Sequence, residues 1–441
     1  EYIVVGAGSA GAAVANRLSA NGKHRVLVLE AGRESHPWSR IPVGFAKLID
    51  NPAANWRYSS EPDEGSGQRR IPVPRGKLLG GSSSINGMVF TRGQSQDYDI
   101  WAQLGNRGWS YSDVLPIFKE MESYKGEADE EYRGRDGVLK VSESLETGPL
   151  YDAIIKAASE AGIEYTKDYN GASQDGIGMS QTTIRNGRRM STAYCYLDPA
   201  RSRNNLTIQA NALTECILFE GKRCTGVRYR HKGATVEAKA TREVVISAGA
   251  INSPQLLELS GIGQAERLKT LGIEVQQELP GVGENLRDHY APRFTVRVKN
   301  SDSINERVRG LGLVKEVADW ILFRRGVLTL VPTLIYCFWR SNPKIANTDL
   351  QMSFTPASYR EGVQNQLDDF PGMTMAAWQQ CPDSLGYVHA RSANPFDKPI
   401  IQPNYLKEDN DRRVLLAGMK MARQLLSLIH ISEPTRRTPI S

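Results

Sequence analysis

Three glycines near the start of the chain, in the stretch GAGSAG at residues 6–11, have the spacing of a phosphate-binding loop. Gly6 permits a tight turn, and Gly8 lets the backbone approach a pyrophosphate. Gly11 allows a helix to pack closely on a strand. A helix that begins at such a loop holds phosphates with its free N–H groups. The stretch therefore predicts a dinucleotide site, with a glycine-rich turn in an empty domain as the alternative.

The carboxylate of Glu30 narrows the choice of nucleotide. Glu30 ends the β-type run of residues 25–30, which follows a predicted helix at residues 10–20. At the end of such a strand a carboxylate accepts hydrogen bonds from both ribose hydroxyls, and it would repel a 2′-phosphate. An adenosine without that phosphate is favoured, which means FAD or NAD and not NADP.

A second glycine-rich stretch, PRGKLLGGSSSINGM at residues 74–88, favours FAD over NAD. A nicotinamide enzyme needs one such loop. A flavin cofactor is longer, and its isoalloxazine ring must be held far from the adenosine end by further small residues and free amides. Taken alone, the second stretch would also fit an ordinary flexible linker. Two more G-x-G stretches, at residues 261–266 and 281–286, lack a preceding strand with the third glycine in place, so we expect turns there and no nicotinamide site.

Several long stretches match the landmarks of one enzyme family. They are Arg75-Gly76-Lys77 with Gly80-Gly81-Ser82-Ser83 and Asn86, STAYCYLDPA (191–200), GAINSPQLLELSGIG (249–263), GVGENLRDH (281–289), DLQMSF (349–354) and IIQPNYL (400–406). With them the chain resembles the glucose–methanol–choline (GMC) oxidoreductases, flavoenzymes that oxidise alcohols. The resemblance covers essentially the whole chain before residue 427 and is closest in look to bacterial choline dehydrogenase-like and alcohol dehydrogenase members.

The resemblance implies a non-covalent FAD and a set of residues that bind it. Some members of the family carry a histidine in the second loop that bonds to the flavin, whereas Ile85 stands at that position here. An alkyl side chain cannot form the bond, so we expect dissociable FAD. The residues that the resemblance assigns to FAD are Gly6, Gly8, Ser9, Ala10, Gly11, Glu30, Arg75, Gly80, Gly81, Ser82, Asn86, Gly87, Met88, Val89 and Thr214.

The resemblance also implies the reaction. In the family a base removes the alcohol proton while hydride leaves the carbinol carbon for flavin N5, and the base is a C-terminal histidine with a histidine or asparagine partner. We assign no catalytic residue, because we expect that segment to be absent from this chain. His430 lacks the glycine-rich surroundings that the family shows. The other histidines fit structural or solvated positions: His24, His36, His231, His289 and His389.

Several functional alternatives stay open at this point. The parent gene would encode an FAD-dependent oxidoreductase that converts a choline-like, other aliphatic, aromatic or furfuryl alcohol to an aldehyde. Oxygen, a quinone or another acceptor would take the electrons. The 441-residue chain itself would be a catalytically inactive FAD-binding fragment. A lyase on the same fold is the further alternative for the parent enzyme.

Composition argues against other classes of function. The net charge is +6, but the lysines and arginines are scattered, and a nucleic-acid partner would need a concentrated basic stripe. The longest apolar run, residues 326–339, contains Pro332 and is too short to span a bilayer. Five cysteines without a C-x-x-C pair disfavour a disulfide framework or a zinc site and favour a cytoplasmic protein. The chain begins at Glu1 without Met, so a leader before it stays an open alternative.

The elements that must position the two loops indicate an α/β fold with two domains. We predict a Rossmann-like FAD-binding domain at residues 1–140 and 205–290, which is discontinuous because a β-rich run returns after residue 205. We predict an α+β substrate domain, with a mainly antiparallel sheet and helices over one face, at residues 141–204 and 291–426.

We also predict three helices and a C-terminal tail. Apolar spacing predicts helices at residues 150–162 and 411–426, and a third at residues 254–260 with Pro254 at its first position. Residues 427–441 have no helical or strand period and contain two prolines. We interpret them as a non-native tail that resembles translated adapter sequence.

Overall fold

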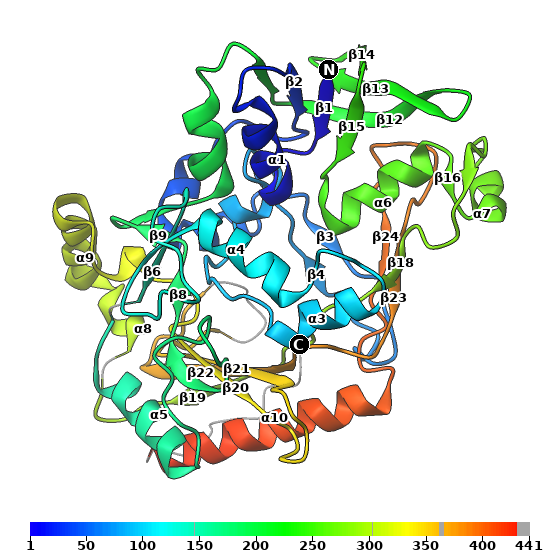
Figure 1. Ribbon diagram of the computed structural model, residues 1–441. Coiled ribbons are helices and arrows are strands. Elements are labelled where there is room, and N and C mark those ends of the chain that lie inside the picture. Colours follow the sequence, from blue (N-terminus) through cyan, green and yellow to red (C-terminus); the bar gives the residue numbers. More distant parts are fainter. Residues whose placement is uncertain (145, 302, 361–365, 430–441) are drawn as a thin grey trace.

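The computed structural model describes residues 1–144, 146–301, 303–360 and 366–429 (Figure 1). The first strand of the chain belongs to a parallel sheet with the strand order β11-β2-β1-β15. Its strands are β1 (Tyr2–Val5), β2 (Val26–Leu29), β11 (Leu206–Gln209) and β15 (Glu243–Ile246). They are rich in valine, leucine and isoleucine, as expected of parallel strands that are covered on both faces. The Rossmann-like half of the predicted fold is confirmed.

Helix α1 (Ser9–Ser19) connects β1 to β2 and packs against the sheet. The side of the helix that faces the protein consists of small residues, including the fully buried Ala12 and Ala15. Small side chains let the helix axis approach the strands closely, which places the helix start directly above the end of β1. The order of elements therefore brings the first glycine-rich loop to the carboxyl edge of the sheet, where α/β folds bind ligands.

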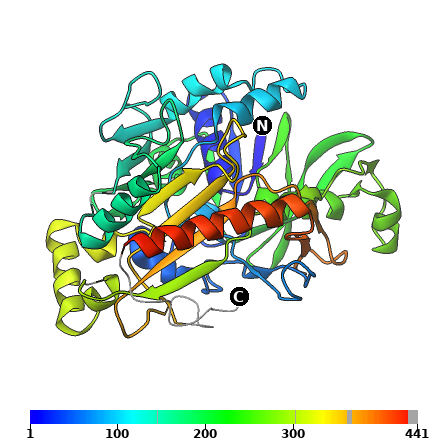
Figure 2. The same ribbon diagram turned by 90° about the horizontal axis from the view of Figure 1, so that it is seen from below.

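A second, antiparallel sheet has the order β19-β22-β21-β20-β7. Its strands are β7 (Gly176–Met179), β19 (Arg293–Arg297), β20 (Ile335–Trp339), β21 (Leu350–Thr355) and β22 (Gly372–Gln379). Figure 2 shows α10 (Asp409–Leu428) lying across this sheet. Helix α5 (Pro149–Glu160) packs beside α10 on the sheet. The expected antiparallel sheet with helices on one face is confirmed, whereas the exact domain boundaries stay a prediction.

The remaining strands form smaller sheets of two or three strands, among them β12-β13-β14, β5-β6-β8 and β18-β23-β24. The remaining helices are α2 (Phe45–Leu48), α3 (Ser95–Gln103), α4 (Tyr111–Met121), α6 (Gly249–Leu259), α7 (Ala265–Thr270), α8 (Ile304–Arg307) and α9 (Gly310–Phe323). The strands are β3 (Tyr58–Ser59), β4 (Pro72–Val73), β5 (Glu122–Lys125), β6 (Leu139–Glu143), β8 (Gln181–Thr182), β9 (Ile184–Arg185), β10 (Arg188–Arg189), β12 (Ala212–Glu220), β13 (Arg223–His231), β14 (Ala234–Lys239), β16 (Ile262–Gly263), β17 (Gln277–Glu278), β18 (Glu284–Leu286), β23 (Gly386–His389) and β24 (Ile400–Gln402). Within the described ranges, no helix has the length and hydropathy needed to cross a bilayer.

The predicted start of helix α6 is wrong. The helix begins at Gly249, so Pro254 lies inside it and not at its first position. Proline in a helix interior loses one backbone hydrogen bond. Buried Ile251 and Leu256, on either side of the proline, pack into apolar clusters and hold the helix in place. The earlier start matters for function, because it brings the N-terminus of α6 close to the end of β15.

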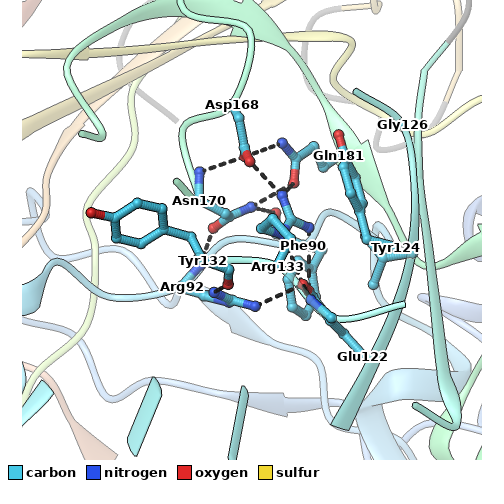
Figure 3. Close-up of polar contacts among 12 residues, drawn as sticks. Phe90, Arg92, Glu122, Tyr124, Gly126, Tyr132, Arg133, Asp168, Asn170 and Gln181 are labelled. Carbon is cyan, nitrogen blue, oxygen red and sulfur yellow. Dashed lines mark hydrogen bonds and ion pairs between the residues drawn. The ribbon is translucent and has the colours of Figure 1, made fainter. Parts of the chain in front are cut away.

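A buried network of charged side chains joins β5, the loop after it and the segment before β7 (Figure 3). Glu122 is fully buried and accepts hydrogen bonds from Arg133 at 2.8 and 3.2 Å. Arg92 lies 2.8 Å from the same carboxylate. Arg133 also donates to Asp168 at 2.7 Å and to Gln181 at 2.8 Å. Each buried charge therefore has an opposite charge in contact, as burial in a medium of low dielectric requires.

Candidate cofactor site

A cavity of about 780 Å³ opens at the carboxyl ends of β1, β2 and β15. Three features converge on it: the first glycine-rich loop, the second one, and the N-terminal turn of α6. Nine of the residues predicted to bind FAD line this cavity: Gly6, Gly8, Ser9, Ala10, Glu30, Arg75, Gly81, Ser82 and Thr214. The cavity lies at the edge of a parallel sheet that is expected to bind a nucleotide.

The three glycines of the first loop are required for three different reasons. Gly6 has a φ of +93°, and a Cβ there would lie 2.6 Å from the Ser247 carbonyl oxygen. A Cβ on Gly11 would lie 1.9 Å from the carbonyl oxygen of Gly6, so only glycine allows α1 to pack this closely. A Cβ on Gly8 would meet no atom nearer than 3.8 Å, because Gly8 borders the cavity. These are the roles that the sequence predicts: turn, packing and open approach.

Helix α1 begins at the cavity without a side-chain cap from the described residues. The first N–H groups of a helix have no partner within the helix. An uncapped helix start at a cavity wall therefore offers hydrogen-bond donors and the positive end of the helix dipole to a phosphate.

The second glycine-rich loop packs directly on the first. The N–H group of Gly80 donates to the Ala7 carbonyl oxygen at 2.8 Å. A Cβ on Gly81 would lie 2.8 Å from the Gly8 Cα atom. The Gly76 N–H group donates to the Ser82 hydroxyl at 3.1 Å, which closes the second loop on itself. The two loops therefore form one continuous backbone wall.

The carboxylate of Glu30 lies at the floor of the cavity, with only 6% of its surface exposed. Its oxygens accept hydrogen bonds from the N–H groups of Ala7 at 3.0 Å and Gly32 at 2.8 Å. Burial raises the pKa of Glu30 to about 7, against the two backbone hydrogen bonds and the nearby Lys77 ammonium, which lower it. Each carboxylate oxygen keeps acceptor capacity for a further donor, such as a ribose hydroxyl.

One buried polar atom on the cavity wall has no partner. The hydroxyl oxygen of Thr214 is buried and makes no hydrogen bond within the described residues. Buried polar groups in native proteins are nearly always paired, so an unpaired one at a cavity suggests a ligand contact. Thr214 is one of the residues that the resemblance assigns to FAD, and that assignment stays a prediction.

Some wall residues were not predicted from the sequence. The Trp56 ring lies under the Lys77 ammonium, 4.4 Å from it, and both residues line the cavity. Asn252, in the first turns of α6, lines it as well and donates to the Tyr58 hydroxyl at 2.8 Å. A signal for α6 was present, because Gly249 follows β15 with two residues between them, whereas Gly6 follows β1 directly. No local sequence pattern predicts that Trp56 lines the cavity, because its position depends on contacts with another segment of the chain.

The other six predicted residues lie behind or beyond the cavity wall. Gly11 and Gly80 support the two loops from behind. Asn86, Gly87, Met88 and Val89 continue from the second loop toward the antiparallel sheet and do not line the cavity. The Met88 side chain is buried in the core of that sheet, which leaves only its backbone for a ligand. For all fifteen residues, FAD binding stays a prediction.

Two of the histidines in the described residues make structural contacts. His389 in β23 lies between two carboxylates, with Nδ1 2.8 Å from Glu258 and Nε2 3.0 Å from Glu284. Both ring nitrogens are therefore engaged. His289 contacts the Gln380 carbonyl oxygen at 2.9 Å. His430 and most of the predicted tail lie outside the described residues, although α10 extends two residues past the expected end, to Leu428.

Comparison with known proteins decides the family. The N-terminal profile of the GMC oxidoreductases matches residues 1–291, and the C-terminal profile matches residues 382–438. The chain belongs to the GMC oxidoreductase family. The match to the C-terminal profile of these GMC oxidoreductases includes part of the predicted tail, whose origin stays a prediction.

Among curated GMC oxidoreductases, the oxygen-dependent choline dehydrogenases of Brucella anthropi and Rhizobium etli are each 39% identical to this chain over 426 residues. That alignment covers 96% of this chain and 77% of each relative. Among solved structures, pyridoxine 4-oxidase from Mesorbium loti matches with a TM-score of 0.87 at 24% identity, over 100% of this chain and 84% of that one. An FAD-dependent oxidoreductase from Chaetomium thermophilum matches equally well, over 99% and 84%. These structural matches confirm the fold.

Proposed function

We propose that this GMC oxidoreductase binds FAD non-covalently in the cavity at the two glycine-rich loops. The observation that carries the proposal is the continuous backbone wall of both loops, with the Glu30 carboxylate at its floor. The wall offers N–H donors to a pyrophosphate, and Glu30 offers acceptors to a ribose. Non-covalent binding is supported by Ile85, an alkyl side chain buried with Leu48 and Leu78, at the position where the resemblance places a flavin-bonding histidine in some members.

We further propose that the parent enzyme oxidises a choline-like alcohol to an aldehyde. The curated relatives that match most of this chain carry the name oxygen-dependent choline dehydrogenase, which supports that substrate class and oxygen as an electron acceptor. Bound FAD would supply the hydride acceptor. This chain's own residues would bind and orient the cofactor, and its antiparallel sheet would form one side of the substrate space.

For the 441-residue chain itself we propose binding without turnover. The support for this is that none of the described histidines lines the cavity, and that His389 and His289 are engaged in structural contacts. Removing a general base costs on the order of 10²–10⁴ in rate. We therefore expect the chain to bind FAD, and we do not expect an alcohol to reduce the bound FAD.

Titration of the purified chain with FAD, followed by protein and flavin fluorescence, tests both claims. We expect saturable binding, and complete release of the flavin into the supernatant when the protein is denatured. We expect no bleaching of bound flavin when choline is added without oxygen. An absence of binding overturns the cofactor proposal, flavin that stays with the precipitated protein overturns non-covalent binding, and bleaching by choline overturns the inactivity.

The raised pKa of Glu30 predicts how FAD affinity depends on pH. Below about pH 7 Glu30 is protonated in the free protein, and a neutral carboxyl accepts fewer hydroxyl donors. Binding to both ribose hydroxyls must then release a proton, so affinity is expected to fall about tenfold per pH unit below about pH 7 and to level off above it. FAD titrations between about pH 5.5 and 8 measure this. Glu30→Gln is the control, because it should bind weakly with no pH slope; a Gln variant that keeps the slope contradicts the assignment.

A further inference from the structure

Arg189 is a buried cation without a counter-charge. Its side chain is among the most deeply buried in the protein, with 2% of the residue exposed. The Nη1 group donates to the Ser83 carbonyl oxygen at 3.1 Å and to Asn86 Oδ1 at 2.7 Å. Nε and Nη2 find no hydrogen-bond partner, and no carboxylate in the described residues pairs with the guanidinium. Burial lowers the pKa of Arg189 to about 9, so the side chain is still charged at neutral pH.

Both contacts of Arg189 are to the second glycine-rich loop, and one of them fixes a side-chain amide. Asn86 Oδ1 accepts from Arg189 and also from the Met88 N–H group at 3.0 Å. A guanidinium and a backbone N–H group only donate, so the Asn86 oxygen must face them. The opposite orientation would place the Asn86 NH₂ group against two donors. The Nδ2 hydrogens of Asn86 are therefore directed away from Arg189, and the Asn86 residue is exposed.

We propose that Arg189 is a positioning residue for the cofactor, which orients the Asn86 amide so that its N–H groups face FAD. The inference rests on the proposed function, since it takes the loop at residues 86–89 to run along the flavin and its ribityl–pyrophosphate chain. The phosphates and the flavin carbonyls of FAD are hydrogen-bond acceptors, so an amide that presents donors matches them. FAD is also an anion, and its negative charge would lie near a guanidinium that has no other counter-charge.

A purely structural role for Arg189 makes different predictions. If the guanidinium only ties Ser83 to β10, its loss would lower stability and affinity together, whatever stands at position 86. If Arg189 acts through Asn86, replacing Arg189 should no longer change the affinity for FAD once the Asn86 amide has been removed. Residues that act as a unit show such non-additivity in double-mutant cycles.

Dissociation constants for FAD in wild type, Asn86→Ala, Arg189→Met and the double variant test the proposal. We expect about tenfold weaker binding in each single variant and no further loss in the double variant. Additive losses, near 100-fold in the double variant, would overturn the proposal, and so would single variants that bind FAD like wild type. Arg188→Met, at the neighbouring position of β10, is the matched control and should bind FAD normally.

Asn86→Asp separates the cofactor role from stability. An aspartate keeps the oxygen that Arg189 binds and supplies the missing counter-charge, but it has no N–H donor for FAD. We expect the free protein to unfold at the same or a higher temperature than wild type while FAD binds at least tenfold more weakly. Wild-type affinity in this variant would overturn the proposal.

Three further outcomes also decide between the alternatives. If Arg189→Met does not fold, Arg189→Lys replaces it, both alone and combined with Asn86→Ala. A loss of affinity that Arg189→Lys causes only while Asn86 is present then supports the proposal, and an equal loss in both backgrounds overturns it. If wild type itself does not bind FAD, the proposed function fails. If wild type binds FAD and the variants do as well, only the role of Arg189 fails.

Discussion

Replacing Gly11 with alanine is expected to abolish FAD binding and to lower the free energy of unfolding by about 1–3 kcal/mol, the usual cost of overpacking. The new Cβ would lie 1.9 Å from the Gly6 carbonyl oxygen. Gly6 cannot yield, because its N–H group is bonded to Leu29 in the sheet at 2.8 Å and its own Cβ position is blocked by Ser247. Either α1 moves off the sheet or the loop at the cavity deforms.

Gly8→Ala is the matched variant in the same loop. A Cβ at Gly8 meets nothing within 3.8 Å, so the stability of the free protein should change little. FAD binding should still weaken by about tenfold or more, because the methyl group would occupy space that the pyrophosphate needs. Urea unfolding of the free proteins and FAD titration measure the two effects. Gly281→Ala, whose Cβ would meet no atom within 4 Å, should be neutral. A Gly11→Ala protein that unfolds at the wild-type midpoint would contradict the packing argument.

Glu122→Gln is expected to destabilise the protein by about 3–5 kcal/mol, because it removes the counter-charge of the buried Arg92 guanidinium and one of the two counter-charges of Arg133, which keeps Asp168. Glu122 is fully buried, pairs with Arg92 and Arg133, and accepts the Gly134 N–H group at 2.9 Å. Glutamine has nearly the same shape, but it is neutral and brings an NH₂ donor into a site that already holds two cations. The expected loss of stability is therefore electrostatic, because glutamine fills the same space and leaves no cavity.

A surface pair provides the control for that prediction. Glu127 pairs with Lys167 at 3.3 Å, and both side chains are largely exposed. Because water screens such pairs, Glu127→Gln should change stability by less than about 1 kcal/mol. Chemical denaturation of both variants measures the difference. Equal small effects would show that the Glu122 network carries little of the stability.

The sequence predicted well those parts of the fold that depend on local signals. The strand at Tyr2–Val5, the glycines after it and the alanine-rich helix are contiguous, so their physical roles can be inferred from neighbouring residues. The same holds for α10, whose apolar spacing marks its buried face. Family resemblance added the second loop and Thr214. The start of α6 was missed, because Pro254 is a local signal that tertiary burial of Ile251 overrides.

Long-range pairing is what the sequence could not predict. Arg189 contacts Asn86, 103 residues earlier in the chain, and neither residue carries a local sign of the other. The partners of Glu122 also come from separate segments, and an arginine in a sequence does not reveal whether it will be buried. Trp56 lies at the cavity in contact with Lys77, which comes from a separate segment. In each case burial fixes the contact, and burial depends on how the whole chain folds.

The position of β15 beside β1 has a consequence for how the protein is made. The Ser247 backbone that packs against Gly6 is synthesised some 240 residues after it. At about 5–20 residues per second, that interval lasts roughly 10–50 s. During this time the edge of β1 that pairs with β15 stays unpaired. The cavity also lacks the part of its wall that the end of β15 and the start of α6 provide. The FAD site that we propose would therefore be completed only late in synthesis, after the segment that contains Ser247 has been made.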